Sequence, residues 1–128
     1  MTSESLDKRT AIILFAHGSA IAEANLEVAR LAENLANRLG CSAGWGFLEI
    51  AQPNLGAAIA QAAHGGAIRV VIVPYFLTMG VHVQRDLPRL VEQQRALFPQ
   101  LEILVAQPLE RSPGLPDLLL DRVKEVLP

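Results

Sequence analysis

Short apolar runs alternate with amphipathic stretches four times along this 128-residue chain. The apolar runs have the length of strands and fall at residues 11–16, 44–50, 68–76 and 102–107. Such alternation predicts a repeated βα unit, and runs that are apolar throughout are typical of parallel strands covered on both faces. Right-handed crossovers favour the strand order 2-1-3-4 in a three-layer, flavodoxin-like α/β domain with helices on both faces. The first and third strands are then neighbours.

Apolar residues spaced by three or four positions predict the first helix over about 20–39. Ser19 is available as its N-cap, and Gly40 as its left-handed stop. The second helix is expected to begin near Pro53, in its first turn, and to end before Gly65.

Prolines set the expected limits of the last two helices. The third helix is predicted to start between 82 and 87 and to end at 98, because Pro88 is tolerated in a first turn and Pro99 marks a stop. The fourth is predicted over 113–126, with Ser112 as N-cap and Pro113 as first residue. Residues 1–10 are polar and are predicted to be a disordered leader. Residues 11–128 are predicted to form one domain.

Charge and cysteine content exclude several classes of function. A net charge of −2 argues against a broad nucleic-acid surface, which needs clustered lysine and arginine. The lone Cys41 cannot form a disulfide within the chain or supply a cysteine-rich metal site, which fits a cytoplasmic protein. No apolar run approaches the length of a membrane span.

Two histidines follow two of the predicted strands. His17 comes directly after the first strand, in His17-Gly18-Ser19, and His82 follows the third, after Gly80-Val81. If the two strands are parallel neighbours, both imidazoles lie at one crevice, at the switch point where such folds bind ligands. Imidazole is both a common ligand of Zn, Co, Ni and Fe(II) and a base suited to neutral pH.

Other residues near this crevice could take part in binding or catalysis. Glu49 lies at the end of the second predicted strand and is a candidate third ligand, proton acceptor or solvated carboxylate. Gly18 and Gly80 allow close backbone approach, and the N-termini of the first and third helices would direct amides towards anionic groups. Arg85 would add a cation, and Tyr75 with its neighbours would form an apolar wall. His64, at the end of the second helix, is expected to have no catalytic role.

Four separated motifs, in this order, resemble the small, single-domain sirohydrochlorin cobaltochelatases and ferrochelatases (CbiX-like, class II chelatases). These are His17-Gly18-Ser19, Phe47-Leu48-Glu49 with Gln52-Pro53, Val73–Leu77 with Gly80-x-His82 and Asp86-Leu87-Pro88, and Ala106–Leu109. The resemblance covers about residues 11–126. One departure is Ala20, where family members usually carry arginine.

The resemblance implies ATP-independent insertion of a divalent metal, cobalt or iron and possibly nickel, into sirohydrochlorin or a related tetrapyrrole. It implies that His17 and His82 handle the metal with Glu49 nearby, and that Gly18, Ser19, Tyr75, Gly80 and Arg85 bind the anionic substrate. It also implies a homodimer, and a metal that is a substrate, with no organic cofactor.

Three other interpretations use the same residues. A metal or tetrapyrrole carrier would use both histidines without turnover. A phosphohistidine phosphatase or mutase would need arginine before His17, where this chain has Ala16. A receiver or flavin module would need an acidic cluster or a longer Ser- and Thr-rich first loop.

Overall fold

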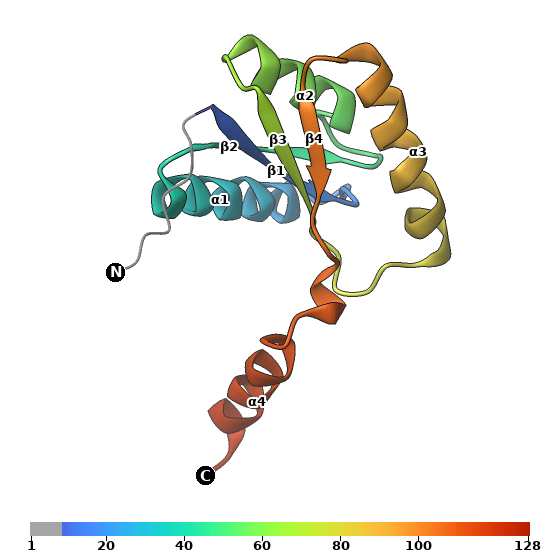
Figure 1. Cartoon of the computed structure of the whole chain (residues 1–128). Coiled ribbons are helices and arrows are strands. Elements are labelled where there is room, and N and C mark those ends of the chain that lie inside the picture. The colour runs from blue at the N-terminus through green and yellow to red at the C-terminus, as the bar shows by residue number, and fades with distance from the viewer. Residues whose placement is uncertain (1–8) are drawn as a thin grey trace.

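The computed structural model describes residues 9–128, so most of the predicted leader lies outside the described residues. Four parallel strands form one sheet in the order β2-β1-β3-β4, as the sequence predicted. The strands are β1 (Thr10–Ala16), β2 (Ser42–Phe47), β3 (Arg69–Pro74) and β4 (Glu102–Val105). The helices are α1 (Ala22–Leu39), α2 (Leu55–His64), α3 (Val81–Leu97) and α4 (Leu115–Val126), with a 3₁₀ turn, η1 (Leu109–Arg111), before the last (Figure 1).

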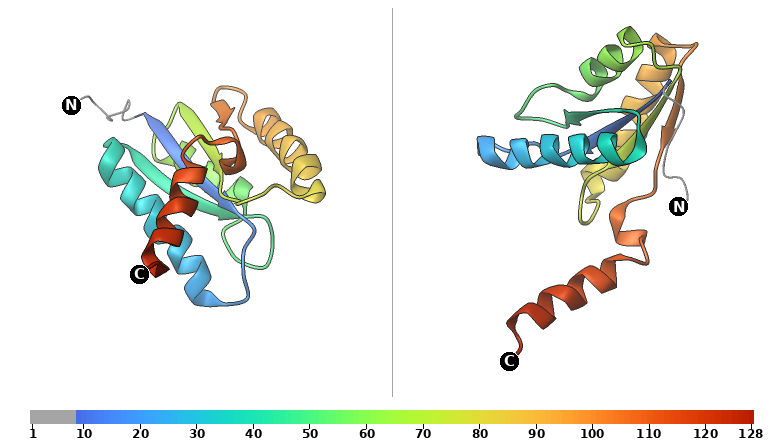
Figure 2. Two further views of the ribbon diagram at one scale, coloured as in Figure 1. Left: turned by 90° about the horizontal axis from the view of Figure 1, so that it is seen from below. Right: turned by 90° about the vertical axis from the view of Figure 1, so that its left-hand side faces the viewer.

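Two apolar cores lie on the two faces of the sheet. Successive strand residues point to opposite faces, so β1 sends Ile13 and Phe15 to one face and Leu14 and Ala16 to the other. The larger core lies under α2 and α3, and the smaller one lies under α1 (Figure 2). All seven residues of β1 are buried, and residues 11–16 are apolar, as expected for a strand covered on both faces.

The helix starts differ from the predicted ones. α1 begins at Ala22, and the Ser19 hydroxyl accepts a hydrogen bond from the Ile21 N–H at 3.0 Å in a turn before the helix, so Ser19 is not its N-cap. Gly40 is the expected left-handed stop, at φ 69°. α2 is capped by Asn54, whose side chain accepts from Ala57 N–H at 2.9 Å, and Pro53 therefore lies outside the helix.

α3 begins at Val81, so Pro88 lies inside the helix and not in its first turn. Proline cannot donate to the carbonyl four residues earlier, which belongs to Gln84. Gln84 is exposed, so water can solvate that carbonyl. An exposed position therefore tolerates a proline that a buried helix would exclude.

α4 begins at Leu115 and not at 113, because Pro113 follows the 3₁₀ turn η1. It projects away from the rest of the molecule (Figures 1 and 2). None of its residues is buried. Within the described part of the chain, no helix is long and apolar enough to cross a membrane.

Candidate functional site

The carboxyl ends of β1 and β3 open into a cleft of about 660 Å³. Three segments supply its walls: the turn after β1, the segment after β2, and the loop from β3 into α3. Its lining residues are His17, Leu48, Glu49, Phe76, Thr78, Gly80, His82, Val83 and Asp86. The fold thus brings His17, Glu49, Gly80 and His82 to one cleft, as expected from the parallel order of their strands.

His17 and Glu49 are in direct contact. The Nε2 atom of His17 lies 3.0 Å from Oε1 of Glu49, and both side chains are more than half exposed. Nδ1 of His17 lies 3.2 Å from the carbonyl oxygen of Gly18. When Nδ1 carries the proton and donates to that carbonyl, the Nε2 lone pair faces a carboxylate oxygen. A proton or a metal cation can then sit between them.

The backbone fixes this pair. Glu49 N–H donates to the His17 carbonyl at 3.1 Å, which extends the β1–β2 pairing one step past the end of the sheet. Gly18 has a φ of +95°, and a Cβ on it would lie 2.0 Å from the Glu49 carbonyl oxygen. Glycine is therefore required at this position both for its conformation and for the close approach.

A strained turn follows Glu49. Ile50 has a φ of 73°, which is unusual for a β-branched residue, and Ala51 N–H donates to the Glu49 carbonyl at 2.7 Å. Strain of this kind persists where surrounding contacts impose it, and it occurs often at functional sites. Here it turns the chain sharply just after the carboxylate that meets His17.

The opposite wall is the start of α3. Gly80 is the N-cap, and His82 lies in the first turn, so free amides of the helix end lie beside the cleft. Nδ1 of His82 lies 3.1 Å from a guanidinium nitrogen of Arg85. A guanidinium can only donate, so Nδ1 accepts and the neutral imidazole carries its proton on Nε2.

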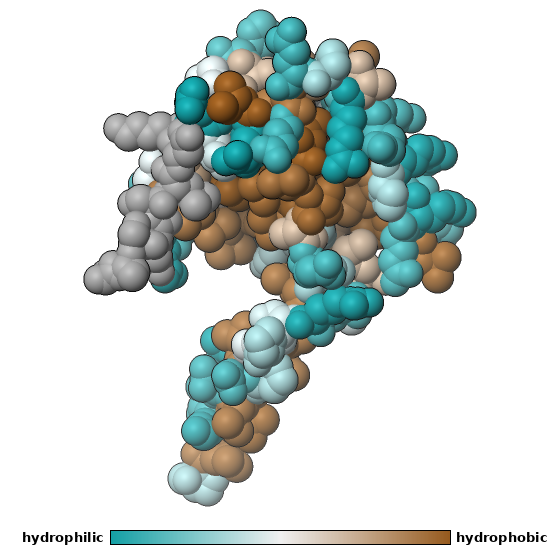
Figure 3. Space-filling model, viewed as in Figure 1, coloured by the Kyte–Doolittle hydropathy of each residue, from teal (hydrophilic) through white to brown (hydrophobic). Residues whose placement is uncertain are grey.

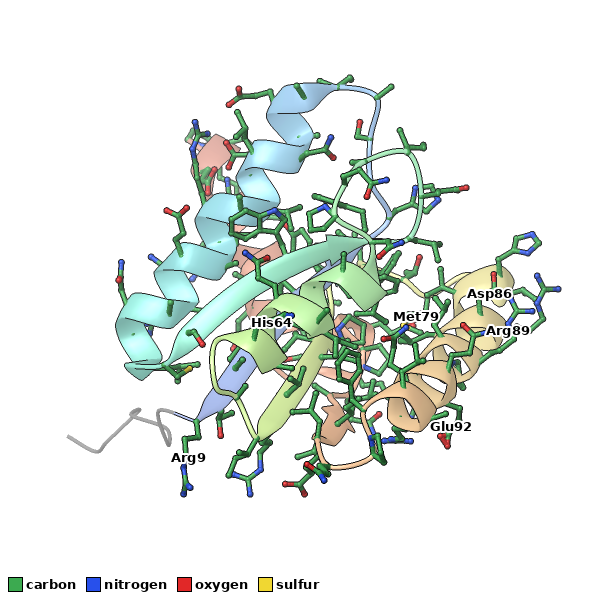
Figure 4. All side chains as sticks on the ribbon, turned by 90° about the horizontal axis from the view of Figure 1, so that it is seen from above. Arg9, His64, Met79, Asp86, Arg89 and Glu92 are labelled. Atoms are coloured by element: carbon green, nitrogen blue, oxygen red, sulfur yellow. The ribbon has the colours of Figure 1, made fainter. Side chains whose placement is uncertain are left out.

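Asp86 is a cleft residue to which the sequence analysis gave no role. It follows His82 by four positions, a spacing that places two side chains on one helix face, and this signal could have identified it. Its carboxylate accepts from Arg85 at 3.1 Å and from Arg89 at 3.2 Å. Figure 4 shows Asp86 and Arg89 on the first half of α3.

The other predicted residues lie outside the cleft lining. Tyr75 is partly exposed, and Phe76, its neighbour, forms the apolar wall by packing edge-to-face on Phe15 at 5.9 Å. Ser19 is occupied by its hydrogen bonds with Ile21 and Asn25. Arg85 contacts His82 and Asp86 from the rim. Substrate-binding roles for these residues stay predictions.

His64 is the last residue of α2 and lies apart from Asp86 in Figure 4. It does not line the cleft. Within residues 9–128, no three His, Cys, Asp or Glu side chains lie close enough together to hold a metal ion.

Three comparisons with known proteins agree with one another. Residues 11–126 match the CbiX family model. The sirohydrochlorin cobaltochelatase of Methanopyrus kandleri is 30% identical over 91% of this chain and 96% of its own length. The solved structure of a cobalamin (vitamin B12) biosynthesis CbiX protein from Marinobacter aquaeolei is 32% identical, with a TM-score of 0.80 over 91% of this chain and 95% of that one.

A more distant structure shares the fold. The sirohydrochlorin chelatase SirB from Bacillus subtilis, solved in complex with cobalt, has a TM-score of 0.81 at 22% identity. The match covers 91% of this chain but 50% of SirB, so this chain corresponds to half of the longer protein. From the family match along nearly its whole length and the similarity to relatives of its own size, the chain belongs to the CbiX family.

Proposed function

We propose that this protein is a chelatase that inserts a divalent metal ion, cobalt or iron and possibly nickel, into sirohydrochlorin in cobalamin or siroheme biosynthesis. The observation that carries the proposal is the meeting of His17, paired with Glu49, and His82 in one open cleft. The similarity to a sirohydrochlorin cobaltochelatase over nearly the whole chain supports the same substrate.

Insertion exchanges one divalent ion for two pyrrole protons, and no electron is transferred. The His17–Glu49 pair is suited to both halves of this exchange. Its facing nitrogen and oxygen can ligate the arriving ion, and once the ion leaves for the macrocycle the same two atoms can hold a released proton. No hydrolysis of a nucleotide is needed for this balance.

His82 faces the cleft from the other wall and is the second candidate base. Because Arg85 donates to its Nδ1, the proton of the neutral ring lies on Nε2. The neutral ring can accept a pyrrole proton at Nδ1 only after it gives up the hydrogen bond from Arg85. Asp86, one turn further along α3, would stabilise the cationic form that results.

The cleft also has features suited to a flat, carboxylate-rich ring. Leu48, Phe76 and Val83 provide apolar walls, and the N-terminus of α3 provides donors for carboxylate groups. The metal is a substrate, and no organic cofactor is part of the proposal.

The assembly and the compartment belong to the proposal as well. We infer a homodimer from the resemblance to two-domain chelatases and a cytoplasmic location from the unpaired Cys41. Burial raises the pKa of the Cys41 thiol, so this side chain remains protonated and is a poor nucleophile.

The decisive test follows sirohydrochlorin absorbance after addition of Co²⁺ or Fe²⁺, with the macrocycle in large excess over protein. Wild-type protein is expected to turn over more than one equivalent. His17→Ala and His82→Ala are each expected to lower the insertion rate at least about 100-fold, the lower limit for loss of a general base. Circular dichroism spectra should stay unchanged.

His64→Ala is the matched control, because this histidine lies outside the cleft, and its insertion rate should equal that of the wild type. Unchanged rates in both cleft variants would overturn the assignment. Stoichiometric binding without turnover would identify the protein as a carrier.

A further inference from the structure

The wall of the cleft that carries His82 begins with a loop that has few backbone hydrogen bonds. Most of the cleft lining comes from the segment that runs from the end of β3 into α3, namely Phe76, Thr78, Gly80, His82, Val83 and Asp86. At the start of this segment, Tyr75 N–H donates to the Phe15 carbonyl at 2.7 Å. Within residues 9–128, residues 76–79 make no hydrogen bond to another backbone group. The position of this wall therefore depends on side chains.

Met79 is the residue at which side chains hold the loop. Its N–H donates to a carboxylate oxygen of Glu110 at 3.1 Å, and its carbonyl accepts from the side-chain amide of Gln84 at 2.8 Å. Its own side chain packs against the core under α2 and α3. Figure 4 shows Met79 beside α3. Both backbone polar groups of Met79 are thus satisfied by side chains, one from η1 and one from α3.

Glu110 reaches this loop from a distant part of the chain. It lies 31 residues after Met79, in η1, and it is exposed. Figure 3 shows hydrophilic surface, in teal, where η1 joins the sheet to α4. Glu110 is not among the residues that line the cleft, so it acts on the cleft through Met79. A carboxylate is a strong acceptor, which suits it to hold a loop that has no backbone partner.

We propose that Glu110 and Gln84 are positioning residues for metal insertion, which hold Met79 and thereby keep His82 opposite His17. Gly80, the N-cap of α3, follows Met79 directly, and His82 lies two residues further on. A displacement of Met79 therefore moves the start of the helix and the imidazole together. A misplacement of about 1 Å in a catalytic group can cost about 100-fold in rate. The effect on rate rests on the proposed function, whereas the effect on the loop does not.

Exchanging amide for carboxylate at the two positions separates the hydrogen bonds from size and charge. Position 110 accepts, and glutamine there keeps an acceptor oxygen. Position 84 donates, and a glutamate carboxylate there has no proton to give. Glu110→Ala and Gln84→Glu are each expected to lower kcat for sirohydrochlorin metallation at least about 10-fold. Glu110→Gln should recover most of the wild-type kcat.

The matched controls make the same substitutions at exposed positions away from the loop. They are Glu33→Ala on α1 and Gln93→Glu on α3, and both should keep the wild-type kcat. Gln84→Met removes the donor without adding a charge. It should lower kcat as Gln84→Glu does, because the lost hydrogen bond to Met79 causes the effect in both variants.

The loop itself is measured without turnover, by hydrogen exchange of the Met79 amide in nuclear magnetic resonance spectra of the full chain. Glu110→Ala is expected to speed this exchange at least about 10-fold, the factor for losing a hydrogen bond to a charged acceptor. Glu110→Gln should change it less. The Ile13 amide, in the buried strand β1, should exchange as in the wild type, which shows that the fold is intact.

Each outcome has a distinct meaning. Unchanged exchange of the Met79 amide in Glu110→Ala would overturn the proposed hold on the loop. Faster exchange with an unchanged kcat would overturn the positioning role. An equal loss of kcat in Glu110→Gln and Glu110→Ala would show that the charge of Glu110 matters rather than this hydrogen bond, and would also overturn it. A wild type without turnover would refute the chelatase instead, and the exchange rates would still decide whether Glu110 holds the loop.

Discussion

At the scale of residues, the candidate site depends on a few side chains whose positions are set by backbone contacts. His17 and Glu49 meet because the β1–β2 pairing continues past the strand ends, through the hydrogen bond from Glu49 N–H to the His17 carbonyl. Both residues were identifiable from their places at the ends of strand-length runs. Their direct contact was not, since it depends on Gly18 and on the strained turn at Ile50.

Glu49→Gln is expected to lower the insertion rate by at least about 100-fold, the lower limit for loss of a general base, because the carboxylate that faces His17 Nε2 holds the ion or the released proton with it. The amide keeps the size of the side chain but removes its charge, so folding should be unaffected. The measurement is the initial rate of sirohydrochlorin metallation. The control is Glu23→Gln, which makes the same substitution on the exposed side of α1. Equal rates in the two variants would remove Glu49 from the mechanism.

Gly18→Ala is expected to lower the free energy of unfolding by about 2 kcal/mol or more, because the new Cβ would need the Glu49 backbone to move at a φ that alanine rarely adopts. Urea denaturation measures the loss. Gly44→Ala is the control: nothing lies within 4 Å of its Cβ position, so stability should stay within about 1 kcal/mol of the wild type. Equal losses in both variants would contradict the steric account.

At the scale of elements, the sequence located the four strands and the four α-helices, but it misplaced their ends and did not predict the 3₁₀ turn η1. Ser19 and Pro53 both have the residue types that start helices, yet the helices start later, at Ala22 and Leu55. A local pattern cannot separate a residue that caps a helix from one that forms the turn before it. Asp86 was overlooked for a related reason: its role depends on which face of α3 borders the cleft.

Pro88→Ala is expected to raise the stability of the protein by about 1–2 kcal/mol. Alanine restores the missing N–H donor to the Gln84 carbonyl inside α3, and this gain exceeds the loss of proline's restriction of the unfolded chain. Thermal unfolding checks the prediction as a higher midpoint. Gln93→Ala, an exposed position on the same helix, should change the midpoint less. A lower midpoint for Pro88→Ala would show that the helix depends on the proline.

At the scale of the whole molecule, the parallel order of four strands determines where the chemistry lies. The neighbouring β1 and β3 open the cleft between their carboxyl ends, and α1 and α3 leave these ends in different directions over opposite faces. The same arrangement leaves half of one sheet face bare when α4 points away. The position of the candidate cleft therefore follows from the strand order, and Glu110 ties η1 to the loop after β3 by accepting a hydrogen bond from the Met79 N–H.

The sequence by itself determined the fold class, the strand order, the two histidines and the family. Apolar periodicity and short motifs are local properties of the chain, so they can be recognised without knowing how the chain packs. Only the tertiary structure decided that Glu49 touches His17, that Asp86 and Phe76 line the cleft while Tyr75 does not, and that α4 is unpacked. These facts depend on the distance and direction between residues far apart in the chain. The amphipathic pattern of α4 predicts that it needs an apolar partner, but a pattern cannot say which surface supplies it.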